Sequence, residues 1–536
     1  MKTSTLPSAI NGHIQTRTQV LNGVDKTGAL QSGFVGLRRG KQPLLFLTIF
    51  LTIYLSFGIE LPSSAQSWYN GTWAYRKSHL ITGSSGAGTN YQVRVIVHKA
   101  IGTDAGANVY LGTNVLDDFA DVRFTTSNGT TLLDYWLETG SLTSGTQATF
   151  WVEVAADLGS NQTIYIYYGN SGATTASNGA NTFTLFDDFT GASLDASKWT
   201  KRGGGTPTFA GGLMTVSANS TDPSKIVATG GPQTDNLAIV ARFKVTGGTD
   251  ADERAGVGIH TANTTTPNGY NYVLHNFTAH NEASFLNDGN GWTTGTFTWT
   301  TNTNYIMEVF YDGTNTRGRI NYGTWSSTAM TGRTGYAALN IGSKTAATTT
   351  VWDWAFIRKC LTTEPAHSTW GTEELTPPAI TNFLPIGGCQ GDAGIVITGT
   401  NFTGATAVKF NGVSASYTVD NPTQITATVP LTAITGPISV TTPAGTTTSS
   451  TSFTVNALPT TSVDGQSNIS CFAGSNGSIT IRATGGTGPY NYSVDNGVSW
   501  TPASPVLPNP YQYPGLNVAN GPYRIKVKDS KGCKSK

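Results

Sequence analysis

Four aromatic residues in the middle of the chain have the type and spacing needed to bind a sugar. Tyr270 and Tyr272 are two residues apart, so both rings would project from one face of a strand. Trp292 and Trp299 follow in turn-rich sequence. A flat ring stacks on the apolar face of a sugar while polar neighbours hold the hydroxyls, provided that the ring is exposed. The alternative is that these rings pack in a core.

Two adjacent acids, Asp187 and Asp188, could supply oxygen ligands to a structural calcium ion, because paired carboxylates suit a hard cation. Calcium takes about six to eight oxygen ligands, and the surrounding sequence shows no such set. The alternative, which we favour, is that both carboxylates cap the backbone near the end of a strand. We expect no other cofactor.

Carboxylates at the spacing of a catalytic pair are missing from the sequence. A glycoside hydrolase needs two carboxyl groups that reach one cleft. Glu308 and Asp312 would share a strand face, but not at the spacing of such a pair, and we interpret them as an edge residue and a turn residue. The seven histidines are isolated, and neither H-E-x-x-H nor G-x-S-x-G occurs. The sequence therefore predicts a protein that is not an enzyme.

The composition favours β-sheets over helices or disorder. The chain has 536 residues, of which 63 are Gly and 10% are aromatic. The aromatic residues argue against disorder, and the abundance of Thr, Gly, Val and Tyr argues against helices. A net charge of +1, with 12% charged residues, argues against nucleic acid as a partner. We therefore expect an all-β protein of tandem β-sandwiches after an N-terminal signal segment.

The N-terminal region has the three parts of a secretory signal peptide. Residues 44–59 are apolar and uncharged, Arg38, Arg39 and Lys41 precede them, and small residues at 63–65 follow. This order predicts export to the cell surface or the medium. The apolar run is shorter than the roughly 20 residues of a membrane span. An uncleaved signal anchor is the alternative, and it is the one membrane contact that we expect.

The cysteines fit an exported protein better than a metal site. Cys360, Cys389, Cys471 and Cys533 form no C-x-x-C pair, so the sequence gives little support to zinc binding. Disulfides form outside the cytoplasm. Cys471 and Cys533 lie near the two ends of the last block, where a bond could join its first and last strands. Cys360 and Cys389 flank a domain junction and either pair or remain free, so the connectivity stays open.

Alternating apolar and polar residues predict strands along the chain. Examples are residues 91–97, 150–154, 164–168, 237–245 and 305–311, separated by turns rich in Gly and Asn. Shifts in pattern and Pro-containing linkers divide the chain into five segments. The predicted division is 1–66 as N-terminal extension and signal peptide, then β domains at 67–177, 178–376, 377–457 and 461–536.

The segment 67–177 resembles an uncharacterised family of extracellular domains. The motifs that carry the resemblance are W-x-Y-R-K at 73–77, D-V-R-F at 121–124, Y-W-x-E at 135–138 and I-Y-x-Y-Y-G-N at 164–170. The resemblance implies a surface protein in which this domain stands beside sugar-binding modules. It brings no known chemistry.

The segment 178–376 resembles a jelly-roll of the concanavalin A/laminin-G type. The resemblance rests on the opening F-D-D-F … L-D … K-W at 186–199 and the ending W-D-W-x-x-I-R-K at 352–359. It implies a glycan-binding sandwich, and some members of such families are glycoside hydrolases.

The last two segments resemble modules of surface proteins. Residues 377–457 resemble an immunoglobulin-like IPT/TIG domain, on the phrases I-V-I-T-G-T-N-F at 395–402 and I-T-A-T-V-P at 425–430. Residues 461–536 resemble the repeat of SprB-type gliding-motility adhesins of Bacteroidetes, on G-G-T-G-P-Y at 485–490 and V-x-D-x-x-G-C at 527–533. Such adhesins usually continue through more repeats. The end at Lys536 therefore suggests a truncated reading or another route of attachment.

These observations predict a secreted adhesion protein of the cell surface that binds an extracellular glycan or another surface ligand. The jelly-roll would bind the ligand, and the immunoglobulin-like and terminal repeat modules would act as spacers. Two other classes stay open, namely a polysaccharide-degrading enzyme and a purely structural component of a surface layer or matrix.

Overall fold

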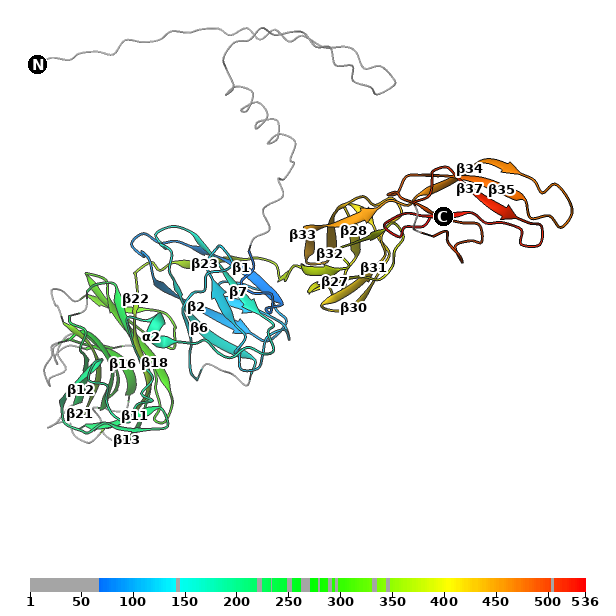
Figure 1. Ribbon diagram of the computed structural model, residues 1–536. Helices are drawn as coiled ribbons and strands as arrows, with labels where there is room; N and C mark the ends of the chain where they lie inside the picture. Colours follow the sequence, from blue (N-terminus) through cyan, green and yellow to red (C-terminus); the bar gives the residue numbers. More distant parts are fainter. Residues whose placement is uncertain are drawn as a thin grey trace, which may run out of the picture. The chain divides into compact units, whose positions relative to one another are not determined.

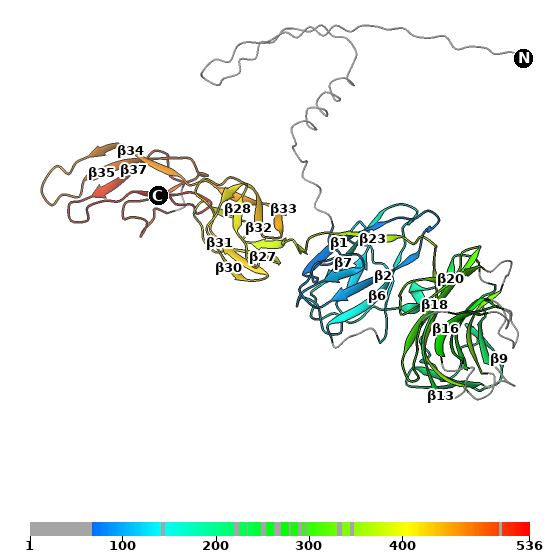
Figure 2. The ribbon, with the colours of Figure 1, turned by 180° about the vertical axis from the view of Figure 1, so that it is seen from behind.

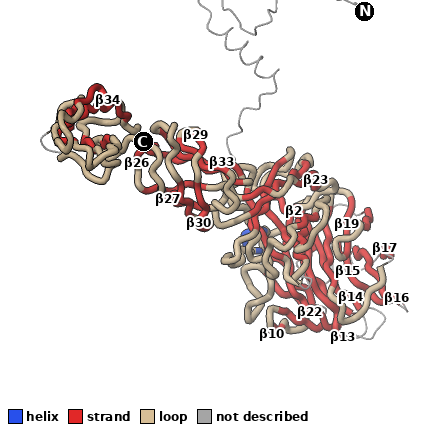
Figure 3. Tube along the Cα trace, turned by 90° about the vertical axis from the view of Figure 1, so that its right-hand side faces the viewer, coloured by secondary structure: helices blue, strands red, loops and turns tan. Residues whose placement is uncertain are grey.

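The computed structural model describes residues 67–140, 145–218, 224–232, 234–247, 253–261, 270–277, 280–287, 292–294, 297–329, 335–343, 348–502 and 506–536. Within these ranges the chain forms β-strands and one short helix, α2 (Gly179–Thr182) (Figures 1 and 2). Strands and connecting loops make up almost all of the tube in Figure 3. The all-β prediction, with tandem β-sandwich modules, is confirmed.

The expected signal peptide and the extension before it, residues 1–66, lie outside the described residues. No helix in the described part of the chain is long and apolar enough to cross a membrane.

The first domain packs two sheets around a core of Val, Ile and aromatic side chains. Its strands are β1 (Tyr75–Thr82), β2 (Tyr91–His98), β3 (Asn108–Tyr110), β4 (Arg123–Thr125), β5 (Tyr135–Leu137), β6 (Gln147–Val154) and β7 (Gln162–Tyr168). One sheet has the order β3-β2-β6-β5, and the other contains β1, β7 and β4. Val93, Val95 and Val97 of β2 are buried in the core, as the alternation predicts.

The first domain is completed by strands that come almost 200 residues later in the sequence. After the large sandwich, β23 (Ala366–Trp370) and β24 (Glu374–Leu375) pair antiparallel with β1. Tyr75 lies opposite Leu375 in this register. The large sandwich is therefore inserted into the first domain, and the boundary predicted at 376 falls ten residues or more too late. The alternation pattern does not predict this insertion, because the sequence of a short strand does not indicate which distant strand it pairs with.

The inserted sandwich packs two large antiparallel sheets face to face. Its strands are β8 (Leu185–Asp187), β9 (Trp199–Gly203), β10 (Thr208–Ala210), β11 (Leu213–Ala218), β12 (Ser224–Ala228), β13 (Leu237–Gly247), β14 (Glu253–Thr261), β15 (Tyr270–Phe277), β16 (His280–Asn287), β17 (Trp292–Thr294), β18 (Tyr305–Tyr311), β19 (Asn315–Ile320), β20 (Ser326–Ala329), β21 (Tyr336–Ser343) and β22 (Thr348–Lys359). The sheets have the orders β10-β11-β22-β13-β18-β19-β20, with β8 on β22, and β17-β16-β15-β14-β21-β12-β9. Their facing side chains form one core that includes Trp199, Trp299 and Trp352.

The third domain is a smaller sandwich. Its strands are β25 (Ala379–Leu384), β26 (Gly387–Cys389), β27 (Ile395–Thr400), β28 (Ala407–Phe410), β29 (Val413–Ser414), β30 (Tyr417–Asn421), β31 (Gln424–Ala427), β32 (Gly436–Thr442) and β33 (Gly445–Asn456). They form the sheets β25-β27-β31-β30 and β26-β33-β32-β28-β29. Its core is centred on Phe402, Phe410 and Phe453.

The last domain has two small sheets and is joined covalently to the third. Its strands are β34 (Thr460–Ser467), β35 (Gly477–Thr484), β36 (Asn491–Ser493), β37 (Tyr511–Leu516) and β38 (Lys526–Lys528), in the sheets β34-β35-β37 and β36-β38. A disulfide joins Cys389, at the end of β26, to Cys533. Cys360 is free and buried, and Cys471 is free and exposed.

The predicted bond between Cys471 and Cys533 is therefore wrong. Cys471 lies in the loop between β34 and β35, at the end of β34 that is away from the linker, so an eight-residue strand of roughly 25 Å separates it from the linker side. Cys533 lies beside the linker, where Cys389 is paired in register with Asn456. Cys471 and Cys533 lie near the two ends of the last block in the sequence, but they are not close to each other in the folded domain.

Candidate functional site

The aromatic residues predicted to bind a sugar do not form an exposed platform in the described structure. The side chain of Tyr272 is 4% exposed and that of Trp299 is 1% exposed, and both belong to the sandwich core. The ring of Tyr272 packs 4.7 Å from that of Phe285. Stacking on a sugar needs an open ring face, so the prediction is wrong for these two residues. Tyr270 and Trp292 lie in β15 and β17, and their side chains lie outside the described residues.

The carboxylates of Asp187 and Asp188 hold the backbone and neighbouring side chains. Asp187 accepts hydrogen bonds from the Phe189 N–H at 3.0 Å and from Trp199 Nε1 at 2.8 Å, one on each oxygen. Burial raises the pKa of Asp187. Asp188 accepts from the N–H and hydroxyl of Thr190. The capping alternative describes both residues, and the described ranges hold no group of three or more His, Cys, Asp or Glu placed to bind a metal.

Glu308 is not the edge residue that the sequence suggested. It lies in β18, between β13 and β19, and its side chain is 1% exposed. The strand is interior, and the first domain covers its outer face, so the carboxylate is fully enclosed. Asp312 is a turn residue as expected, since it accepts hydrogen bonds from the N–H groups of Thr314 and Asn315.

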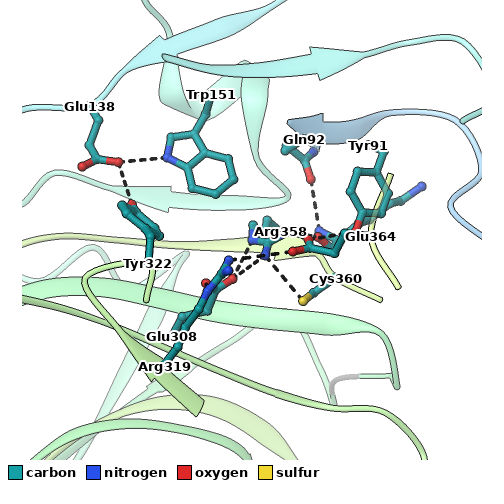
Figure 4. A network of polar contacts seen from close by, with 11 residues as sticks. Tyr91, Gln92, Glu138, Trp151, Glu308, Arg319, Tyr322, Arg358, Cys360 and Glu364 are labelled. Carbon is teal, nitrogen blue, oxygen red and sulfur yellow. Dashed lines mark hydrogen bonds and ion pairs between the residues drawn. The ribbon is translucent and has the colours of Figure 1, made fainter. Parts of the chain in front are cut away.

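A buried ion-pair network joins the first domain to the inserted sandwich (Figure 4). At its centre Arg358, in β22, pairs with Glu308 at 2.6 Å and with Glu364 at 2.5 Å. Arg319 pairs with the second oxygen of Glu308 at 2.5 Å. The hydroxyl of Tyr91, in β2 of the first domain, donates to Glu364 at 3.1 Å. Both oxygens of Glu308 and Oε1 of Glu364 therefore accept from donors of the protein itself, and Oε2 of Glu364 lies 3.8 Å from Arg319.

An aromatic layer packs against one side of this network. The members come from both domains and pack mostly edge to face: Trp136, Trp151, Phe183, Phe186, Trp354 and Phe356. Glu138 is buried at the border and accepts hydrogen bonds from Tyr322 at 2.6 Å and Trp151 at 3.0 Å. Burial raises the pKa of Glu138. Two domains that share this much apolar and charged contact form a single packed unit.

An open groove on the last domain is lined by aromatic and polar side chains. Its volume is about 450 Å³, and its lining includes Tyr513, Tyr523, Asn496, Asn520 and Arg524. Both tyrosine rings are half-buried, and the other three residues are exposed or partly exposed. Among the described residues, no hydrogen bond engages the side chains of Asn496, Asn520 or Arg524. Those polar groups are therefore available to a ligand.

A tight turn and a backbone bridge position the polar side of this groove. Asp495 accepts hydrogen bonds from the N–H groups of Val498 and Ser499, which closes the turn, and these bonds together with that from Ser493 lower its pKa. Asn496 adopts the left-handed conformation with φ of 61°, which asparagine tolerates better than most residues. Its N–H donates to the carbonyl of Arg524, so Asn496 and Arg524 lie side by side.

The aromatic side of the groove is fixed by the domain core. Tyr523 donates its hydroxyl proton to the carbonyl of Asn517 and accepts from the N–H of the same residue, both at 2.9 Å. Burial raises the pKa of Tyr513, whose ring lies 6.0 Å from that of Tyr511. Two hydrogen bonds therefore hold the ring of Tyr523 in place, and Tyr513 packs against Tyr511.

The sequence contained a signal for the buried interface and a weaker one for the groove. Along β22, Trp354, Phe356 and Arg358 alternate with the apolar residues Ala355 and Ile357, so neither face of the strand has the polar side chains of a solvated face. Such a strand is covered on both sides. The groove residues come from three separate stretches of the last domain, which the bridge between Asp495 and Arg524 and the packing of the two small sheets bring together.

Family models match three parts of the chain. A domain of unknown function (DUF2341) matches residues 118–202, an IPT/TIG domain matches 378–455, and an SprB repeat matches 464–499. These matches confirm the resemblances drawn from the motifs. The DUF2341 match runs from the first domain into the start of the inserted sandwich, in keeping with the contact between them. An IPT/TIG domain together with an SprB repeat is typical of a cell-surface protein.

Solved structures similar to this chain each cover about a third of it. A β-1,3-glucanase from Mycobacterium marinum is 15% identical, with a TM-score of 0.26, over 33% of this chain and 98% of its own. The carbohydrate recognition domain of Emp47p is 11% identical, with a TM-score of 0.26, over 33% and 95%. The endo-1,3-β-glucanase of Thermotoga petrophila is 9% identical, with a TM-score of 0.26, over 33% and 97%. No curated protein matches the chain.

Proposed function

We propose that this protein is a secreted adhesion protein of the cell surface that binds an extracellular glycan and does not cleave it. The observation that carries the proposal is the groove of the last domain, whose lining combines half-exposed Tyr513 and Tyr523 with exposed Asn496, Asn520 and Arg524. A sugar ring would stack on a tyrosine, and the amides and the guanidinium would bind its hydroxyls. The SprB and IPT/TIG matches support a place at the cell surface.

The absence of catalysis is part of the same proposal. In the described part of the inserted sandwich, the most enclosed carboxylate is Glu308, and two arginines hold both of its oxygens. A glycoside hydrolase needs one carboxyl group free to give up a proton and a second free to attack or to activate water. The groove itself contains one acid, Asp495, whose oxygens close the turn described above.

A glycan array with the purified whole chain tests the binding. We expect retention of one group of glycans, and we expect Tyr513→Ala to lower the affinity by about tenfold, the loss of one stacked ring. Tyr110→Ala is the matched control, because Tyr110 is a half-buried tyrosine of the first domain whose ring stacks on His98. Retention of no glycan at high protein concentration would contradict the proposal and favour a structural component.

Incubation with a panel of polysaccharides tests the absence of catalysis. We expect no new reducing ends with any glycan that the array retains. The appearance of new reducing ends with the wild type and with Tyr110→Ala would show that the protein is a hydrolase.

A further inference from the structure

A second cavity lies between the first domain and the inserted sandwich, away from the groove of the last domain. Its volume is about 160 Å³. Three arginines line it, Arg94 from β2, Arg319 from β19 and Arg358 from β22, together with Trp151, Glu364 and His367. The size suits a few water molecules or one small polyatomic ion rather than a sugar chain.

The positive charges around this cavity exceed the negative charges paired with them. Arg319 and Arg358 are neutralised by Glu308 and Glu364, since each arginine contacts both carboxylates. Arg94 is the third cation. Within the described ranges, no carboxylate lies at ion-pair distance from Arg94.

Arg94 instead lies on an aromatic ring. Its guanidinium carbon is 4.1 Å from the centre of the Tyr322 ring. Glu138 attracts Arg94 but is not within ion-pair distance of it; its carboxylate accepts hydrogen bonds from Tyr322 and Trp151, and burial raises its pKa. Burial also lowers the pKa of Arg94, because a desolvated guanidinium is less stable when charged.

His367, which also lines the cavity, is not a counterion for Arg94. Its Nδ1 forms a hydrogen bond with Nε2 of His79 at 2.8 Å, and burial together with the nearby Arg94 lowers the pKa of His367 to about 4. A neutral imidazole therefore lines the cavity beside Arg94. Arg94 is half-buried, and a partly desolvated cation gains from a counterion; guanidinium groups bind planar or tetrahedral oxyanions in a forked geometry.

We propose that this cavity binds an oxyanion group, a carboxylate, sulfate or phosphate, with Arg94 as its principal contact. The site lies between the two domains, so a bound anion would also hold them together. This inference is separate from the glycan groove, because Tyr513 contributes nothing to the cavity.

Isothermal titration calorimetry with the whole chain tests the inference. The ligands are sodium sulfate, sodium phosphate, sodium glucuronate and glucose, at constant ionic strength made up with sodium chloride. We expect saturable binding of at least one anion and none of glucose, and a loss of affinity of tenfold or more in Arg94→Gln. Arg482→Gln is the matched control, because Arg482 pairs with Asp464 on the surface of the last domain.

The pattern of binding identifies the source of the anion. Sulfate or phosphate bound more tightly than glucuronate indicates an inorganic ion, and the reverse indicates an acidic sugar. No saturable binding of any anion, or equal binding by the wild type and Arg94→Gln, overturns the inference. Arg94→Lys keeps the charge but not the fork, so an intermediate affinity confirms direct contact if Arg94→Gln is poorly folded. Unchanged anion binding in Tyr513→Ala separates this result from the glycan proposal.

Discussion

Arg358 is the central charge in the contact between the first domain and the inserted sandwich. Its side chain is 1% exposed and satisfies Glu308 and Glu364, which come from the sandwich and from the returning segment. In the sequence Arg358 belongs to the W-D-W-x-x-I-R-K ending, and that motif does not indicate that the arginine is buried. Side-chain burial depends on the opposing domain, so it could not be read from β22 alone.

Replacement of Arg358 by Met is expected to lower the free energy of unfolding by about 3–5 kcal/mol, because two carboxylates would lose their buried partner. Urea denaturation followed by tryptophan fluorescence measures the change. The control is Arg317→Met, which breaks the more exposed pair with Asp312 and is expected to cost about 1 kcal/mol or less. Equal losses in both variants would contradict a special role for the interdomain network.

The histidine pair His79 and His367 makes the stability of the first domain dependent on pH. The pKa of His79 is lowered to about 3 by burial and by the neighbouring His367, and that of His367 to about 4. Unfolded histidine titrates near pH 6.5. Between pH 6.5 and about 4 the unfolded chain therefore binds more protons than the folded chain, and stability is lost as the pH falls.

Each histidine is expected to contribute a loss of about 1 kcal/mol per pH unit over this range. Unfolding free energies of the wild type and of the double variant His79→Asn/His367→Asn at pH 7 and pH 5 measure the effect. We expect a smaller loss on acidification in the variant, since carboxylates titrate in both proteins alike. An identical loss in both would show that the pair does not control the acid response.

At the level of strands, the local sequence pattern predicted where strands lie but not which strands pair with each other. The alternation at 150–154 and 305–311 placed β6 and β18 correctly, because the two-residue period depends on the strand alone. The return of β23 to β1 joins His79 to His367, which are 288 residues apart. Alternation contains no information about such a partner, so the sequence placed 366–375 in the wrong domain.

The return strands are expected to be essential to the first domain. Arg76 pairs with Glu374 at 2.7 Å, and Trp370 stacks 3.8 Å from His79, so their removal exposes both the edge of β1 and a charged side chain. A fragment of residues 67–177 should therefore lack a cooperative thermal transition by circular dichroism. A fragment of 67–376 should retain it. A cooperative transition in the shorter fragment, at the same temperature, would show that β23 and β24 are dispensable.

At the scale of the whole chain, one covalent bond joins the third domain to the last. Cys389 and Cys533 are separated by 144 residues in sequence, and their bond closes a loop around both domains. Disulfides that close long loops stabilise mainly by limiting the unfolded chain. The sequence indicated that disulfides could form in an exported protein, but it did not indicate which cysteines pair, because four cysteines allow several pairings.

Cys389→Ser is expected to lower the stability of the last two domains by about 2–5 kcal/mol, measured by hydrogen exchange of their amides. Cys471→Ser should have no effect, because Cys471 is exposed and free. Thiol titration under denaturing conditions gives an independent count, with two free thiols in the wild type and three in Cys389→Ser. A wild type with four titratable thiols would rule out the bond.

The insertion of the large sandwich also determines how the chain would respond to pulling. Tyr75, where the chain enters the first domain, lies opposite Leu375, where it leaves. Tension applied along the polypeptide would therefore pass between two adjacent strand ends and bypass the roughly 300 residues between Tyr75 and Leu375, the inserted sandwich among them. As long as β24 stays paired with β1, the inserted sandwich carries no mechanical load, and its own unfolding cannot lengthen the tether.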